Sequence, residues 1–409
     1  MPEPSTRQST LRSNFLHLYA DVFWFGVLFG STLSFIAVYA TRLGASTFQL
    51  GLITGGPAIL NLLISLPSAH WLQNRNLIRS TFITSIAQRS GYALLVLLPW
   101  LVPQAMSEVW AVIAIVLVIA LPGTLLAVSF NSMFAEVVPA QYRADVVGRR
   151  NALMSLSITF TTFVCGRLLD WIGSPANYQI VFGIGALGAA MSSYHLWRLR
   201  PLAVVNSPIS NLQSPAATSK KPGRLLRLDL LRGSFGQLVL AYLCFHITQH
   251  LNIPINPLFW IKTLQLTDGE IGAGNAMFFA TMALGSLALP RLTARYGTRR
   301  LLGVSALLYC LYPLILGLAW DYLLFWGASI LSGFVWGVCN GCLLNRLMER
   351  VPAYDRPAHM AWQNVALNFG ILGGSFIGSS MVNWISYREG LLVTAGLRVL
   401  SAIVIMLWA

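Results

Sequence analysis

Charged residues are scarce in this chain of 409 residues. They make up 10% of the sequence, against 56% hydrophobic residues, whereas a soluble domain carries about 25% charged residues. Most of the chain therefore faces something other than water. Apolar stretches of about 20 residues recur from end to end, and each is long enough to cross a bilayer as a helix. Helices are required there because a backbone in lipid must satisfy its own hydrogen bonds.

Cysteines and acidic residues are also few. The five cysteines all fall inside apolar stretches, so no disulfide framework is predicted. Cys339 and Cys342 form a C-x-x-C pair without a second pair or a neighbouring histidine, and we expect no metal site and no cofactor. The 13 acidic residues do not form the carboxylate clusters of a membrane enzyme, and there is no nucleotide-binding loop. The net charge of +14 is spread between the apolar stretches, which indicates contact with anionic lipid and not with nucleic acid.

The apolar stretches predict twelve membrane-spanning helices. Their approximate ranges are 15–40, 48–72, 80–101, 109–134, 148–172, 177–198, 233–261, 270–290, 301–320, 322–346, 358–384 and 387–408. Residues 199–230 hold four prolines and a Lys220–Lys221 pair, the composition of a polar linker. We therefore expect a cytoplasmic tail at 1–14, a six-helix bundle at 15–198, the linker at 199–230 and a second six-helix bundle at 231–409.

Basic residues predict the orientation. The tails and loops on the N-terminal side of the spans carry 21 Lys and Arg, and the opposite loops carry three, Arg42, Lys262 and Arg388. Basic loops stay in the cytoplasm. We expect a monomeric multi-pass protein of a prokaryotic cytoplasmic (inner) membrane, with both termini in the cytoplasm.

The two halves repeat each other. Residues 139–143 (PAQYR) match residues 352–356 (PAYDR) at an offset of 213, at which Asn151 also meets Asn364. Earlier in each half, at an offset of 221, Gly51 meets Gly272. Parallel repeats of six spans joined by a linker are the architecture of transporters that hold a solute near the midplane and expose it alternately to the two sides.

One loop carries a family motif. Residues 290–300 (PRLTARYGTRR) resemble the G-x-x-x-D-R-x-G-x-R-R motif of the major facilitator superfamily, with Pro290 and Ala294 in place of its first Gly and its Asp. The motif residues that are kept are Arg295, Gly297, Arg299 and Arg300. The resemblance covers nearly the whole chain and implies an all-α integral membrane protein with twelve transmembrane helices in two six-helix pseudo-repeat halves. The fifth span lacks the Gly-Pro-rich motif of the family's drug–proton antiporters.

The resemblance also implies a gate at the cytoplasmic ends of the helices. Glu136 and Glu349 precede the two Pro-Ala-x-x-Arg segments, and a glutamate there can form ion pairs that exist only when that face is closed. The candidate gate residues are Glu136, Arg143, Arg295, Arg299, Glu349 and Arg356. The alternative is that these are solvated charges at the membrane interface.

Four charged residues lie within the predicted spans and more than two residues from either end: Asp21, Arg89, Arg167 and Arg398. A charge inside the bilayer is costly, so each is a functional candidate. Asp21 is the single carboxylate, and the first span of each half lines the central cavity in the family. We therefore expect Asp21 to couple transport to a proton. The alternative is a structural ion pair with Arg89 or Arg150.

The seventh span holds the densest set of uncharged polar side chains. The candidate substrate-binding residues of this span and of spans one and ten are Trp24, His246, Gln249, His250, Asn252, Trp336 and Asn340. Aromatic walls with a few amide and imidazole groups suit a neutral or amphipathic organic solute. The alternative is hydrogen bonding between helices.

The sequence as a whole predicts a secondary active transporter and not an enzyme. It would move a small neutral or amphipathic organic solute across the cytoplasmic membrane by alternating access, coupled to a proton by symport or antiport. The solute, the coupling ion and the lipid bilayer are the expected partners, and nucleic acid is not. Two alternatives remain: a membrane receptor or accessory protein that does not transport, and an integral membrane enzyme that handles lipids.

Overall fold

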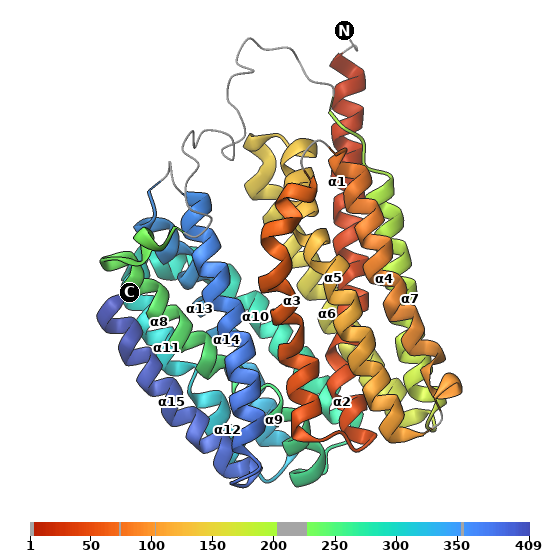
Figure 1. Cartoon of the computed structure of the whole chain (residues 1–409), viewed down its shortest axis with the longest axis vertical. Helices are drawn as coiled ribbons and strands as arrows, with labels where there is room; N and C mark the ends of the chain where they lie inside the picture. The colour runs from red at the N-terminus through yellow and green to blue at the C-terminus, as the bar shows by residue number, and fades with distance from the viewer. Residues whose placement is uncertain (1–3, 73–74, 103, 203–226, 353–355) are drawn as a thin grey trace.

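The computed structural model describes residues 4–72, 75–102, 104–202, 227–352 and 356–409. The described residues form helices and connecting turns and contain no strand, which confirms the all-α prediction (Figure 1). The helices of the first half are α1 (Pro4–Leu28), the π-helix η1 (Phe29–Leu33), α2 (Ser34–Arg42), α3 (Thr47–Leu72), α4 (Leu77–Leu101), α5 (Ala105–Val137), α6 (Ala140–Trp171) and α7 (Ala176–Trp197).

The second half begins with a short 3-10 helix, η2 (Leu228–Leu231). It continues with α8 (Ser234–His250), α9 (Ile255–Leu258), the π-helix η3 (Phe259–Thr263), α10 (Asp268–Tyr296), α11 (Thr298–Leu308), α12 (Leu311–Leu318), α13 (Tyr322–Arg350), α14 (Arg356–Met381) and α15 (Tyr387–Trp408). Residues 203–226, most of the predicted linker, lie outside the described residues.

The helices coincide with the predicted spans. Among the described residues, eleven helices or runs of consecutive helices are long and apolar enough to cross a membrane. Helix α14, with 26 residues, is the more polar twelfth, and it packs against α3 and α8. The chain therefore has the twelve-helix architecture that its apolar stretches predict.

Local sequence fixes where several helices start. Thr267 and Glu270 form a capping box at α10, and Ser386 and Glu389 form another at α15. In the first half, Ser46 and Gln49 exchange the same two hydrogen bonds at the start of α3. Each pair satisfies backbone N–H groups that a helix start leaves without partners.

The first span of each half is irregular at matching places. The π-helix η1 occupies residues 29–33, and at the offset of 221 these positions meet residues 250–254, which are the last residue of α8 and the turn that joins it to α9. In the second half Pro254 and Pro257 account for the break, because proline lacks the N–H that a helix interior needs. Both halves therefore depart from regular α-helix at matching places near the middle of the span.

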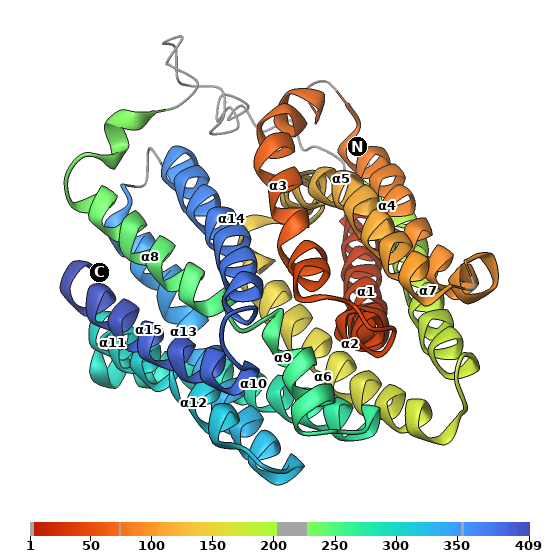
Figure 2. The same ribbon diagram turned by 60° about the horizontal axis from the view of Figure 1, so that its bottom comes forward.

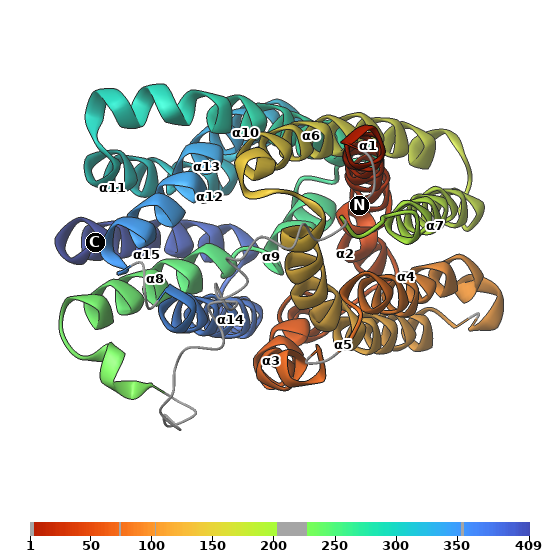
Figure 3. The ribbon, with the colours of Figure 1, turned by 90° about the horizontal axis from the view of Figure 1, so that it is seen from above.

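The two halves meet along two pairs of helices. Helix α6 packs against α10, and α3 packs against α14 (Figures 2 and 3). We call the end at which α1 begins the terminal end (top of Figure 1), and the opposite end the sealed end.

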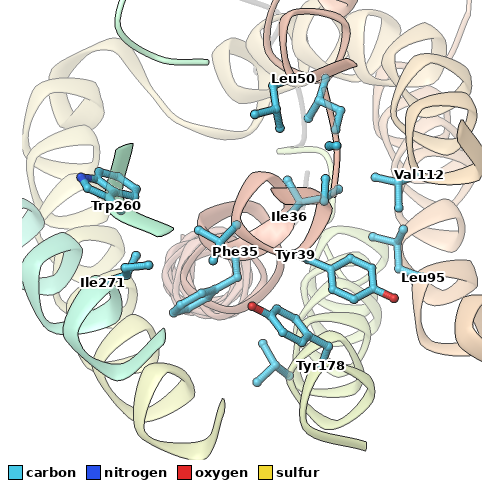
Figure 4. Close-up of a cluster of buried hydrophobic side chains, with 14 of the residues drawn as sticks. Phe35, Ile36, Tyr39, Leu50, Leu95, Val112, Tyr178, Trp260 and Ile271 are labelled. Atoms are coloured by element: carbon cyan, nitrogen blue, oxygen red, sulfur yellow. The ribbon is translucent and has the colours of Figure 1, made fainter. Parts of the chain in front are cut away.

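One large apolar cluster spans both halves near the sealed end. Phe35, Tyr39 and Leu95 come from the first half, and Trp260 and Ile271 from the second (Figure 4). All five side chains are buried. This shared core closes the space between the halves at the sealed end, because apolar area removed from water resists separation.

Candidate functional site

Polar contacts between the halves gather at the sealed end. The Arg42 guanidinium donates to Asp268, with Nη2 2.9 Å from Oδ1 and Nε 3.1 Å from it, and Nη2 also donates to the Leu266 carbonyl at 2.7 Å. The Tyr178 hydroxyl donates to the other Asp268 oxygen at 2.8 Å. Beside them, Asp170 accepts hydrogen bonds from Thr267 Oγ1 and from the Gly269 backbone N–H. We call Arg42, Asp170, Tyr178 and Asp268 the latch.

Small residues bring the paired helices close together next to the latch. A Cβ atom added to Gly272 of α10 would lie 2.8 Å from the Gly166 Cα of α6. On the other side, a Cβ atom added to Gly55 of α3 would lie 2.8 Å from the Ser375 Cβ of α14. Both approaches are closer than real Cβ contacts, so each depends on the glycine.

A central cavity of about 750 Å³ lies between the halves. Helices α2, α3, α4 and α5 line it from one side, and Asn364 and Asn368 of α14 line it from the other. Asn61 joins the two sides, since it accepts from Thr124 Oγ1 at 2.5 Å and donates to Asn368 Oδ1 at 3.2 Å. The polar side chains of the lining are all uncharged: Thr54, Asn61, Gln88, Tyr92, Thr124, Asn131, Asn364 and Asn368.

A second cavity of about 420 Å³, which we call the charged pocket, adjoins the first. Gln88 and Asn131 line both cavities, and Asp21, Arg89 and Arg150 line the charged pocket alone. Both arginines pair with Asp21, because Arg150 Nη2 lies 3.1 Å from Oδ2 and Arg89 Nη2 lies 3.6 Å from Oδ1. Asp21 therefore forms ion pairs with both of the arginines that the sequence offered as alternative partners.

The Asp21 carboxylate also accepts from the Ser192 hydroxyl at 2.5 Å. One turn toward the terminal end, the Nδ1 atoms of His17 and His195 lie 3.0 Å apart. His17 is four residues before Asp21 on α1, and His195 is three residues after Ser192 on α7, so each histidine lies on the same helix face as a member of the Asp21 cluster.

The predicted substrate-binding residues are not part of the lining of either cavity. The lining of the two cavities does not include Trp24, His246, Gln249, His250, Asn252, Trp336 or Asn340. His246 is buried, with Nδ1 3.2 Å from Gln249 Oε1, and His250 Nδ1 lies 2.7 Å from the His246 carbonyl oxygen. The span-seven residues therefore contact one another within the second half.

The tryptophan and asparagine residues among the substrate-binding candidates lie in separate surroundings. Trp336 packs against Phe245 and Tyr309, with ring centroids 6.5 and 5.1 Å away. Asn340 is exposed, and Trp24 is half-buried and lies edge-on to Phe23. Asn252 accepts a hydrogen bond from the buried Arg398.

The predicted gate residues form bonds within their own half. Arg143 donates to the carbonyls of Ala135 and Val138 at the end of α5, and Arg299 donates to the Met406 carbonyl. Glu349 accepts from Arg346 at 2.9 Å. Glu136 and Arg295 are exposed. Arg356 begins α14, and its side chain lies outside the described residues.

Several site residues carry no motif that would single them out in the sequence. The amides of the central cavity are isolated polar residues in apolar spans, and the signal for them is that a polar group inside a membrane needs a partner or a cavity. The repeat is a second signal, because the matched pair Asn151 and Asn364 lines the charged pocket and the central cavity respectively. Asp268 and Arg42 flank predicted spans, so the sequence places them in loops, although both lie in the latch.

Comparisons with known proteins agree with this fold. The family model described as Major Facilitator Superfamily matches residues 238–409. No curated protein sequence matches the chain.

Solved structures match over nearly the full length. A variant of the nucleoside transporter NupG has a TM-score of 0.76 at 14% identity, covering 97% of this chain and 99% of its own. The human organic anion transporter MFSD10 has a TM-score of 0.63 at 16% identity, covering 99% of this chain and 100% of its own. A bacterial homologue of the human lysosomal transporter Spinster, in an inward-facing and unoccupied conformation, has a TM-score of 0.63 at 14% identity, covering 100% of this chain and 97% of its own. At these identities the likeness shows the fold alone.

Proposed function

We propose that this chain is a transporter of the major facilitator superfamily, whose family model matches residues 238–409, and that it moves a small organic solute across a membrane by alternating access. The solute is neutral or amphipathic, and a proton is its coupling ion. It enters and leaves through the central cavity, which both halves line.

The observation that carries this proposal is the cavity itself. Its lining combines apolar walls with amide and hydroxyl groups from the first half and amide groups from the second, which suits an organic solute with hydrogen-bonding groups. The latch and the apolar cluster close one end of the interface, while the bonds of the predicted gate residues at the other end stay within one half. This arrangement supports a state that is open at the terminal end.

We propose that the terminal end faces the cytoplasm of a prokaryotic cell. The 21 basic residues on that side of the spans, against three on the other, support this orientation. Four exposed tryptophans at the other end support a membrane interface there: Trp100, Trp171, Trp320 and Trp384. In this orientation the open state faces inward. The outward-open state would then bring gate residues such as Glu136 and Glu349 against the opposite half.

Proton coupling is assigned to Asp21. Protonation would change the net charge of the cluster formed with Arg89 and Arg150, and with it the attraction that holds α1 to α4 and α6. His17 and His195 lie between this cluster and the terminal end, where they supply groups that can pass protons at neutral pH. A carboxylate whose bonds change with the conformation can link proton binding to the rocking of the halves.

Transport by an Asp21→Asn variant tests this assignment. In proteoliposomes with an imposed pH gradient, we expect the wild type to accumulate a member of a labelled panel containing a nucleoside, a sugar, an amino acid and an aryl monocarboxylate. The variant should lose this accumulation and retain exchange of labelled for unlabelled solute, because exchange does not require a coupled proton.

Asp145→Asn is the matched control, since Asp145 is an exposed carboxylate that pairs with Arg149 on the surface. It should accumulate solute as the wild type does. If Asp21→Asn responds to the pH gradient as strongly as this control, then Asp21 is not the coupling residue. If the wild type neither exchanges nor accumulates any member of the panel, the transport proposal itself is wrong.

A further inference from the structure

The charges of the charged pocket do not balance. One carboxylate, Asp21, faces two guanidinium groups, Arg89 and Arg150, and the exposed fractions of these side chains are 4%, 6% and 13%. The net charge of +1 is buried at membrane depth, where an uncompensated charge is costly. A ligand with one negative charge would neutralise it.

Hydrogen bonding is unbalanced in the same direction. Arg89 donates through Nη1 to Ser85 and Ser193, and Arg150 donates through Nη2 to Asp21. The buried Nε atoms of both arginines have no acceptor in the part of the chain that the structure describes. Arg89 Nη2 lies 3.6 Å from Asp21 Oδ1, so these two groups form an ion pair but no hydrogen bond. The cluster thus holds more donors than acceptors, and an oxyanion supplies acceptors in the geometry that guanidinium groups bind best.

The remaining walls favour an organic anion over an inorganic one. Phe25, Phe130 and Met154 line the charged pocket, and the Phe130 ring lies 4.5 Å from the Arg150 guanidinium carbon, which fixes the plane of that group. A pocket of about 420 Å³ with such walls exceeds the needs of a small ion. Gln88 lines both cavities, so its amide side chain lies where a ligand would pass from one to the other.

We propose that the transported solute is an amphipathic monoanion. Its single anionic oxygen group, such as a carboxylate, binds Arg89 and Arg150 in the charged pocket, and its uncharged body extends past Gln88 into the central cavity. This inference rests on the proposed function and names the class of its solute. A dianion is disfavoured, because it would leave the pocket with a buried net charge of −1.

The test compares the affinities of 3-phenylpropanoate and its uncharged amide, 3-phenylpropanamide, for the purified protein by calorimetry. We expect the carboxylate to bind at least about tenfold more tightly, since a charge-assisted hydrogen bond accounts for such a factor. Arg150→Gln should abolish this preference. Arg149→Gln is the matched control: it removes the neighbouring arginine, which is exposed, and should keep the preference.

Asp21→Asn provides an independent variant that does not depend on the folding of Arg150→Gln. It raises the net charge of the charged pocket to +2, so phenylsuccinate, a dianion, should bind it at least about tenfold more tightly than it binds the wild type. Equal wild-type affinities for the carboxylate and the amide would overturn the proposal. So would equal losses in the Arg150 and Arg149 variants, or full displacement of the carboxylate by chloride or inorganic phosphate at equal concentration.

Failure of this inference can be told apart from failure of the transport proposal. If the amide crosses proteoliposomes as fast as the carboxylate, and Arg150→Gln changes neither rate, the anion site is wrong while transport stands. If 3-phenylpropanoate binds with the predicted preference and crosses no membrane, the anion site stands while transport is wrong.

Discussion

Arg398 is a buried cation whose partners are oxygens of uncharged groups. It donates to the carbonyls of Thr248, Gln249 and Tyr309 and to the Asn252 side chain, at 2.6–3.4 Å. Two of these carbonyls belong to the last turn of α8, where a helix end leaves its carbonyls without partners. Arg398 therefore stabilises the break between α8 and α9, and its role is structural.

Replacing Arg398 should destabilise the second half. Arg398→Met leaves several buried acceptors unsatisfied, so we expect the free energy of unfolding to fall by about 3 kcal/mol or more. Thermal unfolding in detergent measures the effect. Arg291→Met, at an exposed position on α10, is the control and should unfold at the wild-type temperature. Equal unfolding temperatures for the two variants would contradict the structural role.

At the scale of single residues, the sequence showed which charged residues are unusual, but it showed less well which side chains surround them. Asp21, Arg89 and Arg398 stand out because charges are rare in apolar spans, and Arg89 and Arg150 were the expected partners of Asp21. The positions of the partners across four helices, including Ser192, could not be read from spacing. The same limit applies to the amides of the central cavity, whose role depends on which helices surround them.

Helices α6 and α10 depend on glycine for their contact. At Gly272, a side chain would collide with the Gly166 Cα and the Thr162 carbonyl oxygen, both of which are backbone atoms. Backbone atoms cannot turn aside as a flexible side chain can, so the two helices must separate when this residue gains a side chain. The same reasoning applies less strictly to α3 and α14, where Gly55 faces a serine side chain.

Gly272→Val should therefore open the sealed end. In a protein whose five native cysteines are replaced, Ile36→Cys reports on access to the central cavity, which Ile36 lines. We expect a several-fold faster reaction with a membrane-impermeant maleimide added on the sealed side. Gly183→Val is the control, because a Cβ atom at Gly183 meets nothing within 4 Å. An equal labelling rate in both variants would mean that the glycine contact does not hold the end closed.

The sequence predicted the helices themselves well, because length and apolar composition are strong signals at membrane thickness. In the seventh span, Pro254 and Pro257 are a sequence signal for a break, and the turn between α8 and α9 lies there. The π-helix at residues 29–33 carries no proline and has no such signal. Comparison of the two halves at the offset of 221 identifies it after the structure is known.

The latch acts on the whole molecule, because it joins the two halves. Asp268→Asn removes the charge that Arg42 and Tyr178 share. Since the Arg42 side chain is 35% exposed, we expect only a few-fold to about tenfold shift of the equilibrium toward the state open at the sealed end.

Spin labels at Phe48→Cys and Trp384→Cys measure this shift. Both positions are exposed at the sealed end and lie on opposite halves. In the cysteine-free protein, the population at the longer distance should rise in Asp268→Asn. It should not rise in Asp145→Asn, which breaks a surface pair within one half. An unchanged distance distribution in both variants would show that the latch does not hold the halves together.

The charged pocket lies wholly in the first half, and its net positive charge has a consequence for membrane voltage. When the halves rock, this charge changes its depth in the electric field, which acts with about 2.3 kcal/mol per elementary charge per 100 mV. While Asp21 is ionised, a bound monoanion cancels the charge, so the protein that carries the solute without the proton reorients without electrical work. The empty protein does not, and a negative cell interior holds it in the inward-open state. A proton on Asp21 adds one positive charge to either state. Voltage would then act on the empty step of the cycle and on every step that carries the coupled proton.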